Sequence, residues 1–489
     1  MITPRLPALA LAALSALLVV SSARPAATEP ERSQRHAPAS LEEAVKKLAS
    51  EVHEWGGTLG VSVVDLATGK ELASFQADQP RNPASNAKLV TAAAALRVLG
   101  PGHRFVTGLY GKLSGDTVDE LVLRGDGDPS FRSADLYAMA TELRAAGVRK
   151  VRSIAVDQSL FDDEYVPPAF AQQPSEWAPF RAPVAPVSLD ENTVLFSVRP
   201  TKDGHAAVIE AEPRGFVDVT GRVDTRRKGD PEKLIISLQP RGSRLGAALS
   251  GNVPEGSRPI KIVKRADDPR LLAGYALRSI LKDLGVEVAS DPKLGGEGEK
   301  RAIASHRSAA LGELLGELGK QSDNFYAEMI FKAMGAAKKG RPASAGGGAE
   351  AAIASLKELG AFEEGTVVVN GSGLFDADRI SAKAMVSLLR AAYQDPSIGP
   401  EYVAQLSIGG VDGTLKNRFK DQAATRAIRA KTGTLDAVAA LSGYVLGPKG
   451  RAPIAFSILV NGISGKVGAA RQGMDRVVES AAAALWKSN

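Results

Sequence analysis

The feature that most constrains the fold of this sequence is an alanine-rich stretch, residues 82–96, in which almost every residue from Ser85 onward is a good helix former. Pro83 leads it and suits the first turn of a helix, where its missing N–H leaves no hydrogen bond unmade. The stretch therefore predicts a helix that begins at or near Ser85. Residues three apart share one face of a helix, so the Lys88 amine reaches the Ser85 hydroxyl without help from the rest of the fold.

This serine–lysine pair has a chemical reading and a structural one. A serine hydroxyl is a weak nucleophile at neutral pH and needs a proton acceptor, and lysine becomes one when burial or a second cation lowers its pKa. A helix N-terminus also offers backbone N–H groups to an oxyanion. However, the same spacing recurs at Ser279/Lys282 and Ser290/Lys293. Spacing alone does not distinguish a catalytic pair from a solvated helix face.

The N-terminal residues are typical of an exported protein. In residues 1–23, Arg5 precedes an apolar run that ends in small residues, the pattern of a secretory signal peptide. Residues 24–40, rich in proline, alanine, serine and charge, predict a flexible tether. We expect a periplasmic or secreted protein with no stable membrane span. The alternative is that residues 1–23 stay attached as an uncleaved anchor.

Composition narrows the kinds of chemistry open to the chain. The absence of cysteine excludes disulfides, thiolate metal sites and a cysteine nucleophile. The five histidines show neither metal-ligand spacing nor a Gly-x-Ser-x-Gly motif, which disfavours a Ser-His-Asp enzyme. The net charge of +6 is spread along the chain without aromatic residues interleaved in its basic clusters, so no nucleic-acid partner is expected. We expect neither a metal nor a cofactor, and the sequence predicts no oligomeric state.

The chain divides into an interrupted domain and the segments that interrupt it. Between about residues 100 and 301, short β-like segments and turns replace the longer helical patterns found on either side. The expected parts are one discontinuous domain (41–100 with 302–489), an inserted accessory domain (101–195 with 259–301) and a second, β-rich insert (196–258).

The discontinuous domain is expected to have an α+β fold. Its expected elements are a helix (41–55), a hairpin (59–75), three late strands (427–433, 441–446, 454–460) and a closing helix (467–486). We expect them to assemble into one antiparallel sheet flanked by helices. The glycine- and alanine-rich residues 339–349 predict a loop.

Three short motifs follow one another along this domain: Ser85-x-x-Lys88, Ser322-x-Asn324 and Lys431-Thr432-Gly433. Each is weak alone. In this order, on a helix start, an inter-helix loop and a strand, they indicate one active site, because unrelated structural needs have no reason to produce the ordered set.

With these motifs the chain resembles the serine penicillin-recognising enzymes, and within them the class C low-molecular-mass penicillin-binding proteins, the D-alanyl-D-alanine carboxypeptidase/endopeptidase family. Residues 322–328, 370–374, 410–415 and 430–435 are especially similar to that family. The resemblance implies a transpeptidase domain of the penicillin-binding-protein/β-lactamase type with large β-rich inserts. It also implies an exported serine hydrolase that acts on peptidoglycan stem peptides ending in D-Ala-D-Ala and is acylated by β-lactam antibiotics.

The resemblance assigns catalytic roles to five residues. Ser85 attacks the carbonyl of the penultimate D-alanine, and Lys88 accepts its proton. Lys431 is the second cation expected to lower the pKa of Lys88. Ser322 relays a proton to the leaving amine, and Asn324 holds the substrate amide.

The strand that bears Lys431 is expected to line the substrate. The hydroxyls of Thr432 and Thr434 suit the terminal carboxylate, and Gly433 removes a side chain where that backbone must approach closely. The N–H groups of Ser85 and Thr434 would form the oxyanion hole.

Two alternatives remain at this point. One is a β-lactamase-like hydrolase on the same fold. The other is a non-catalytic protein that binds the cell envelope, which loss of Ser85, Lys88 or Lys431 would have favoured. All three are present.

Overall fold

The computed structural model describes residues 40–486, except 297 and 421–424. The predicted signal peptide and nearly all of the predicted tether lie outside the described residues. No helix in this described part of the chain combines the length and the apolar character that crossing a bilayer requires.

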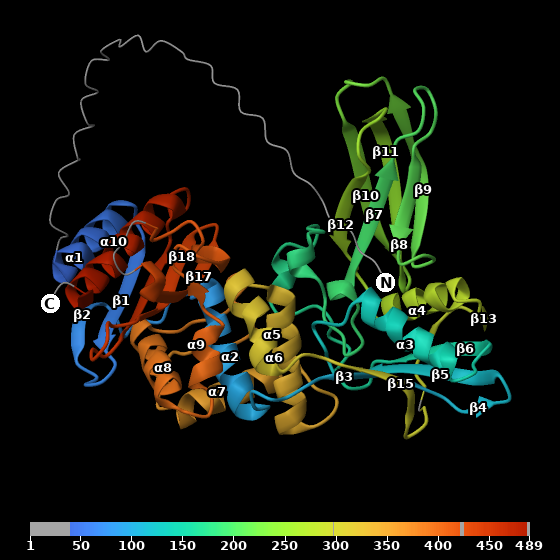
Figure 1. Ribbon diagram of the computed structural model, residues 1–489. Helices are drawn as coiled ribbons and strands as arrows, with labels where there is room; N and C mark the ends of the chain where they lie inside the picture. The colour runs from blue at the N-terminus through green and yellow to red at the C-terminus, as the bar shows by residue number, and fades with distance from the viewer. Residues whose placement is uncertain (1–39, 297, 421–424, 487–489) are drawn as a thin grey trace, which may run out of the picture. The chain divides into compact units, whose positions relative to one another are not determined.

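Strands from both ends of the chain pair into one antiparallel sheet, six-stranded within the described residues (Figure 1). The hairpin of β1 (Thr58–Asp65) and β2 (Glu71–Phe75) joins β19 (Ile454–Asn461) along the whole of β1. The sheet continues through β18 (Val438–Val445), β17 (Ile428–Leu435) and the short β16 (Ser407–Ile408). The prediction of an α+β fold around one antiparallel sheet is confirmed.

Helices cover both faces of this sheet. On one face, α1 (Leu41–Glu54) and α10 (Val467–Trp486), from opposite ends of the chain, lie side by side (Figure 1). On the other face lies α8 (Ala382–Gln394). Successive side chains of a strand point to opposite faces, so the sheet contributes to both cores: Val61 belongs to the first and Leu459 to the second.

The alanine-rich stretch forms the predicted helix. A 3₁₀ turn, η1 (Ala84–Asn86), carries Ser85 and leads into α2 (Ala87–Val98). Every residue from Ala87 to Leu96 is buried. A helix that is apolar all round has no side for water, so α2 lies inside the domain, packed against α6 and α7.

The loop predicted for residues 339–349 is wrong in its second half. Helix α7 begins at Ala345 and runs to Glu358, so residues 345–349 are helical. It follows α5 (Leu311–Gly316), the π-helical η5 (Glu317–Gln321) and α6 (Asn324–Lys339), and it precedes α9 (Gly399–Ala404). Ser344 caps α7 by accepting from Gly347 N. A Cβ on Gly348 would lie 2.4 Å from the Phe331 carbonyl oxygen. These glycines therefore let two helices approach closely instead of forming a turn.

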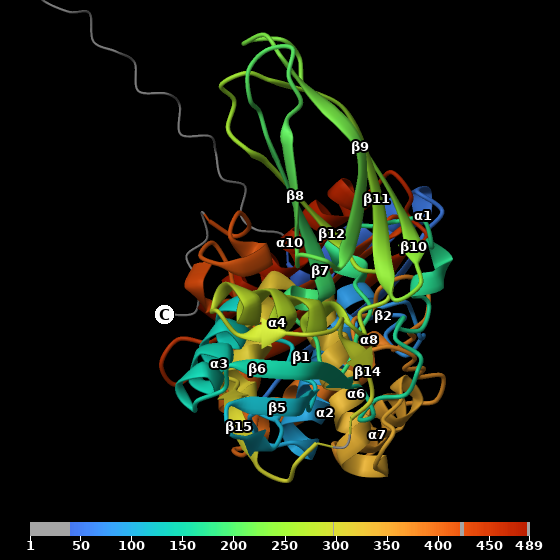
Figure 2. The same cartoon turned by 90° about the vertical axis from the view of Figure 1, so that its right-hand side faces the viewer.

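The first insert forms a separate sheet in the strand order β13-β6-β5-β3-β15, with β4 beside β5 and β14 beside β6. Helices α3 (Ser133–Ala145) and α4 (Leu272–Asp283) share its core (Figure 2). Its strands are β3 (Val106–Tyr110), β4 (Leu113–Ser114), β5 (Thr117–Gly125), β6 (Lys150–Asp157), β13 (Glu287–Val288), β14 (Lys293–Leu294) and β15 (Ala302–Arg307). Because β15 pairs with β3, this sheet extends to Arg307 and not to residue 301 as predicted.

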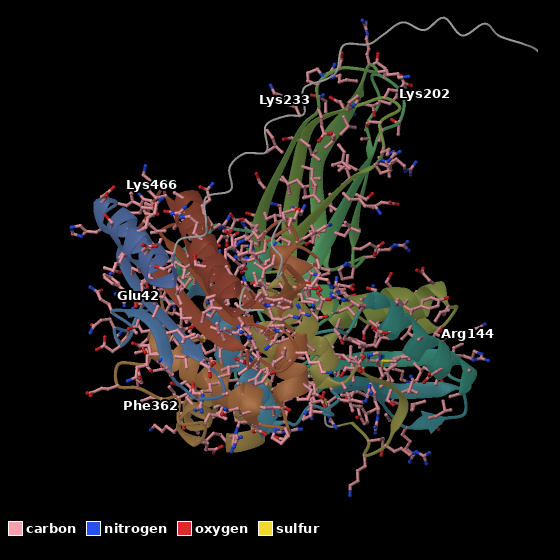
Figure 3. All side chains as sticks on the ribbon, turned by 60° about the vertical axis from the view of Figure 1, so that its left-hand side comes forward. Glu42, Arg144, Lys202, Lys233, Phe362 and Lys466 are labelled. Atoms are coloured by element: carbon pink, nitrogen blue, oxygen red, sulfur yellow. The ribbon has the colours of Figure 1, made fainter. Side chains whose placement is uncertain are left out.

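The second insert consists of two three-stranded sheets within the described residues, β12-β7-β8 and β10-β11-β9. The strands are β7 (Thr193–Arg199), β8 (Val208–Glu212), β9 (Val217–Arg226), β10 (Lys233–Arg241), β11 (Arg244–Pro254) and β12 (Ile260–Arg265). Lys202 and Lys233 lie at the same end of these sheets (Figure 3). The predicted limits of 196 and 258 need correction, since β7 crosses the first and β12, beyond the second, pairs with β7.

Candidate active site

The structure brings the three motifs together. Ser85 lies on η1 and Lys88 in the first turn of α2. Ser322 directly follows η5, Asn324 is the first residue of α6, and Lys431 lies on β17. Lys88 Nζ is 3.2 Å from Ser85 Oγ and 2.7 Å from Asn324 Oδ1. Lys431 Nζ is 2.7 Å from Ser322 Oγ. Five residues spread over almost 350 positions of sequence thus form two serine–lysine pairs, with Asn324 bonded to Lys88.

Lys88 is held by three oxygens around its terminal nitrogen. The side chain is 0% exposed, and Nζ also donates to the Ser372 carbonyl oxygen at 2.8 Å. A neutral amine has two hydrogens and one lone pair. The oxygens of Ser372 and Asn324 can only accept, so they take the two hydrogens. The lone pair is then left for Ser85, which is the arrangement that a general base needs.

Burial is the main cause of the altered proton affinity of Lys88. It lowers the pKa of this amine to about 8, while the carboxyl groups of Glu328, Asp323 and Asp378 act in the opposite direction. We expected the charge of Lys431 to be the lowering influence. Instead, burial and then the charge of Lys88 lower the pKa of Lys431 well below its ordinary value. Repulsion between the two buried amines therefore disfavours a state in which both are charged.

Ser322 is positioned by an unusual backbone conformation. Its φ of 64° lies in the left-handed region, which residues with a side chain rarely adopt. Its hydroxyl accepts from Lys431 Nζ, which also donates to the Thr432 carbonyl oxygen at 2.8 Å. Backbone strain of this kind persists only where the surroundings fix it, and it gathers at functional sites.

Asn324 connects the site to the inserted segments. While its Oδ1 accepts from Lys88, its Nδ2 donates to the Phe180 carbonyl oxygen at 3.0 Å. The sequence assigned Asn324 to the substrate amide, but here both ends of its amide have protein partners. The preceding residue, Asp323, caps α6 by accepting from Tyr326 N at 2.9 Å, and burial raises its pKa to about 6.

Strand β17 lies directly against the turn that carries Ser85. A Cβ on Gly433 would be 2.7 Å from the Pro83 carbonyl oxygen, so this close approach requires glycine. The hydroxyl of Thr432 donates to Thr414 Oγ1 at 2.9 Å. That of Thr434 accepts from Arg471 Nη2 at 2.8 Å. An exposed guanidinium therefore stands beside Thr434, one of the two predicted carboxylate-binding threonines, and the sequence analysis missed it.

Two further buried residues at the site escaped the sequence analysis. Asn86, oriented so that both ends of its amide are satisfied, donates to the Lys431 carbonyl oxygen and accepts from Ser442 Oγ. Glu328, 2% exposed on α6, accepts from Gly371 N and Ser372 N. An acidic residue one turn after Asn324, inside an apolar helical run, is the signal that would have found it.

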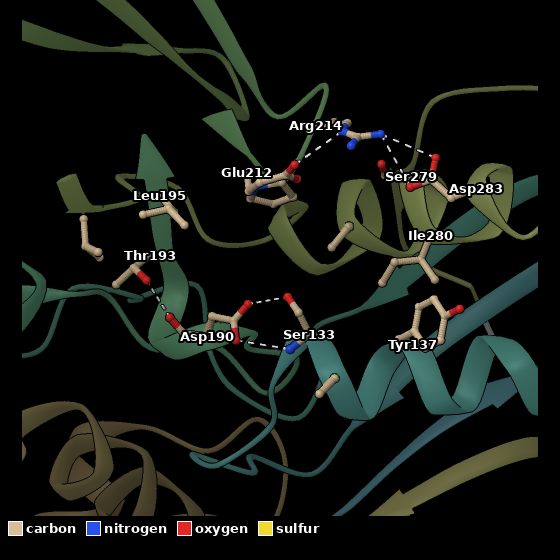
Figure 4. Close-up of a pocket in the computed structure, with 14 residues that line it drawn as sticks. Ser133, Tyr137, Asp190, Thr193, Leu195, Glu212, Arg214, Ser279, Ile280 and Asp283 are labelled. Carbon is tan, nitrogen blue, oxygen red and sulfur yellow. Dashed lines mark hydrogen bonds and ion pairs between the residues drawn. The ribbon is translucent and has the colours of Figure 1, made fainter. Parts of the chain in front are cut away.

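A hollow of about 630 Å³ opens elsewhere, among α3, α4, β7 and β8 (Figure 4). Its charged side chains already have partners: Asp190 pairs with Ser133, and Arg214 pairs with Glu212 and Asp283. None of the predicted site residues lines it.

Comparison with known proteins finds one family and several named relatives of it. Residues 41–483 match the D-Ala-D-Ala carboxypeptidase 3 (S13) family. The chain is 36% identical over 432 residues to a D-alanyl-D-alanine carboxypeptidase of Actinomadura sp., covering 84% of this chain and 79% of that protein. It is 24% identical over 427 residues to D-alanyl-D-alanine carboxypeptidase DacB of Haemophilus influenzae, covering 84% and 86%.

The fold is similar to that of solved structures. Penicillin binding protein 4 (dacB) from Haemophilus influenzae superposes with a TM-score of 0.75 at 23% identity, over 90% of this chain and 99% of that one. A crystal structure of the same protein complexed with a β-lactam gives a TM-score of 0.70 at 24% identity.

Proposed function

The chain belongs to the D-Ala-D-Ala carboxypeptidase 3 (S13) family, and we propose that it removes the terminal D-alanine from peptidoglycan stem peptides through an acyl-enzyme on Ser85. It is a serine-type D-Ala-D-Ala carboxypeptidase. The observation that carries the assignment of Ser85 is the buried Lys88 amine, 3.2 Å from Ser85 Oγ, whose other two partners can only accept hydrogens. Since peptidoglycan lies outside the cytoplasmic membrane, the protein acts in the periplasm or as a secreted enzyme.

Acylation begins when Ser85 Oγ attacks the carbonyl carbon of the penultimate D-alanine. The hydroxyl proton moves to the Lys88 lone pair as the new C–O bond forms. The developing oxyanion is stabilised by the N–H groups of Ser85 and Thr434, on the two segments that Gly433 allows to meet. Neutral Lys88 is a sizeable fraction of the enzyme at physiological pH, because burial lowers its pKa to about 8.

The leaving amine needs a proton when the C–N bond breaks. Ser322 Oγ delivers it, and Lys431 Nζ, which donates to that oxygen, restores it. Binding of the substrate carboxylate beside Lys431 favours its charged form, since an opposite charge raises the pKa of a lysine. Acylation therefore leaves the Ser85 proton on Lys88 and takes one proton from Lys431. Transfer of a proton from Lys88 back to Lys431, directly or through water, restores both lysines, so the net transfer is the Ser85 proton to the departing D-alanine. Water then hydrolyses the ester, with Lys88 again as base.

The edge of β17 provides the binding surface. Strand β16 pairs only with Arg429 and Ala430. Among the described residues, no strand pairs with Lys431–Leu435 on the side away from β18. An extended stem peptide adds there as a further strand. Its terminal carboxylate lies against Thr432, Thr434 and the Arg471 guanidinium. The guanidinium and the hydroxyls donate hydrogen bonds to the carboxylate, and the bond between the two charged groups is of the strong, charge-assisted kind.

β-Lactam antibiotics are covalent inhibitors under the same chemistry, because their strained amide is attacked by the same serine. A solved structure of similar fold has been obtained with such a compound.

The test is the intact mass of the purified protein after incubation with benzylpenicillin. We expect one covalent adduct in the wild type, none in Ser85→Ala, and an unchanged adduct in Ser279→Ala, whose serine has the same spacing to Lys282 on another helix. Release of D-alanine from a D-Ala-D-Ala peptide should follow the same pattern. An adduct that persists in Ser85→Ala would refute the assignment of the nucleophile.

A further inference from the structure

A short loop behind the site has all of its backbone donors bound by side chains. This loop, residues 369–374, contains the Asn-Gly-Ser-Gly-Leu sequence. Its six N–H groups pair as follows: Val369 and Asn370 with Asp378 Oδ1 (2.7 and 3.3 Å), Gly371 and Ser372 with the Glu328 carboxylate (3.1 and 2.8 Å), Gly373 with Asn370 Oδ1 (2.8 Å) and Leu374 with Ser372 Oγ (3.3 Å). Two carboxylates thus hold the loop from behind.

Both carboxylates are buried. Glu328 is 2% exposed and Asp378 is 3% exposed. A buried carboxylate is unfavourable unless hydrogen bonds compensate it. Burial raises the pKa of both groups, that of Asp378 to about 7, and Asp378 Oδ2 has no partner among the described residues. At Glu328, by contrast, the two N–H donors and the charge of Lys88 favour the ionised form, so the loop cannot leave its position without removing that compensation. The loop is therefore fixed more firmly than its glycine content implies.

The front of the loop faces the catalytic helix. The Gly371 carbonyl oxygen accepts from Thr91 Oγ1 at 2.7 Å, and the Ser372 carbonyl oxygen accepts from Lys88 Nζ at 2.8 Å. A Cβ on Gly373, whose φ is +69°, would lie 1.9 Å from the Ala84 carbonyl oxygen. The loop is thus wedged between α6, which carries Glu328, and the turn and helix that carry Ser85 and Lys88.

From this arrangement we propose that Glu328 is a positioning residue for acylation, acting through the loop to fix the Ser372 carbonyl against Lys88. This inference rests on the proposed function, since it concerns the base that activates Ser85. When Ser372 O holds one amine hydrogen and Asn324 Oδ1 the other, the lone pair stays directed at Ser85. Without Glu328, the Gly371 and Ser372 donors lose their acceptors, the loop shifts, and the amine rotates.

The charge of Glu328 gives this role a signature that packing alone does not have. The ionisable groups around Lys88 are Glu328 on α6, Asp323 at its start, Asp378 behind the loop, and Lys431 on β17. Glu328 favours the protonated form of Lys88, so its neutralisation lowers the pKa of the lysine further. The acylation rate falls at low pH because Lys88 becomes protonated, and this fall, the acid limb of the pH profile, must then move to lower pH.

The experiment compares the second-order rate of acylation by benzylpenicillin in Glu328→Gln and in the wild type, from pH 5 to pH 9. The glutamine keeps the shape but presents an NH₂ group to a backbone donor. We expect the plateau rate to fall between about tenfold and a hundredfold, the range for losing a hydrogen bond to a charged group. The acid limb should shift to lower pH. Glu479→Gln, at a partly buried carboxyl on α10, is the matched control and should change neither.

Two further variants keep the test decisive if Glu328→Gln folds poorly. Glu328→Asp retains the charge and should restore part of the rate, with the acid limb near that of the wild type. Thr91→Val removes only the bond to Gly371 O and should slow acylation without moving the limb. A folded Glu328→Gln variant with wild-type rate and limb would overturn the inference. An unacylated wild type would instead overturn the proposed function, so the two failures are distinguishable.

Discussion

The two serine–lysine pairs of the site, Ser85–Lys88 and Ser322–Lys431, use the same residue types in different surroundings. Lys88 contacts two acceptor-only oxygens and has three carboxyl groups around it, whereas Lys431 is affected by burial and by the charge of Lys88. The pKa of Lys88 therefore stays at about 8, while that of Lys431 falls well below the ordinary range. Environments that separate the pKa values of two groups assign them different roles. On this basis we propose that Lys88 serves as the base, and that a substrate carboxylate favours the charged form of Lys431.

The largest expected effect comes from removing the base. Lys88→Ala should lower the rate of acylation by benzylpenicillin by about 10²- to 10⁴-fold, the range that a general base contributes. The measurement is adduct formation over time by mass spectrometry. Lys282→Ala is the control, because Lys282 has the same spacing to a serine on α4. Near wild-type acylation in Lys88→Ala would show that Lys88 is not the base that activates Ser85.

A variant of the Ser322–Lys431 pair should distinguish protonation of the leaving group from activation of the nucleophile, if two substrates with different leaving groups are compared. Ser322→Ala should slow the hydrolysis of a D-Ala-D-Ala peptide by about 10²-fold, because the leaving amine loses its proton donor. A thioester analogue, whose leaving thiolate needs no proton, should be affected much less, whereas Lys88→Ala should slow both substrates. Kinetics with the two substrates check this. An equal loss with both would mean that Ser322 acts before the C–N bond breaks.

The proposed binding site for the substrate's terminal carboxylate lies on the strand that carries Lys431, and variants of Arg471 test it. Arg471→Ala should raise KM for the peptide about tenfold with a smaller change in kcat, because a charge-assisted hydrogen bond to the substrate is lost. Arg471→Lys should recover part of the binding. Lys466→Ala removes a cation that immediately precedes α10 (Figure 3), the helix that carries Arg471, and should have no effect. A change confined to kcat would place Arg471 outside carboxylate binding.

The smallest effect is that of pH on the wild type. Since neutral Lys88 is the active form and its pKa is about 8, the acylation rate should fall about fivefold from pH 8 to pH 7. An acid limb well below pH 7 would instead point to Lys431 as the base. The lowered pKa also makes the free energy of unfolding increase from about pH 8 toward the ordinary lysine range, because the unfolded chain there still binds the proton that the folded chain has released.

Local parts of the site could be predicted from the sequence, and distant contacts could not. The Ser85–Lys88 contact follows from helical spacing alone. The contact of Lys431 with Ser322 joins residues 109 positions apart, so the motifs could indicate a shared site but not which lysine meets which serine. Likewise, Asn324 was recognised, but its bond to Phe180 O depends on how an insert folds back.

Errors in the fold have the same physical origin. Glycine in residues 339–349 was interpreted as backbone freedom, whereas Gly348 serves the close contact of α7 with Phe331. The limits of the inserts were placed where composition changes, but strand pairing decides them, and the pairing of β15 with β3 spans almost 200 residues. Glu328 was passed over because its partners, Gly371 and Ser372, lie on another segment.

The short reach of β16 has a consequence for handling the protein. An open strand edge is a template for any extended chain, including a neighbouring copy. The stretch Lys431–Leu435 is therefore one of the open edges, with β2 at the other side of the same sheet, on which concentrated preparations are expected to associate. A β-lactam bound to Ser85 and lying along that edge should act as a solubilising cap, so acylated protein is the better starting material for crystallisation.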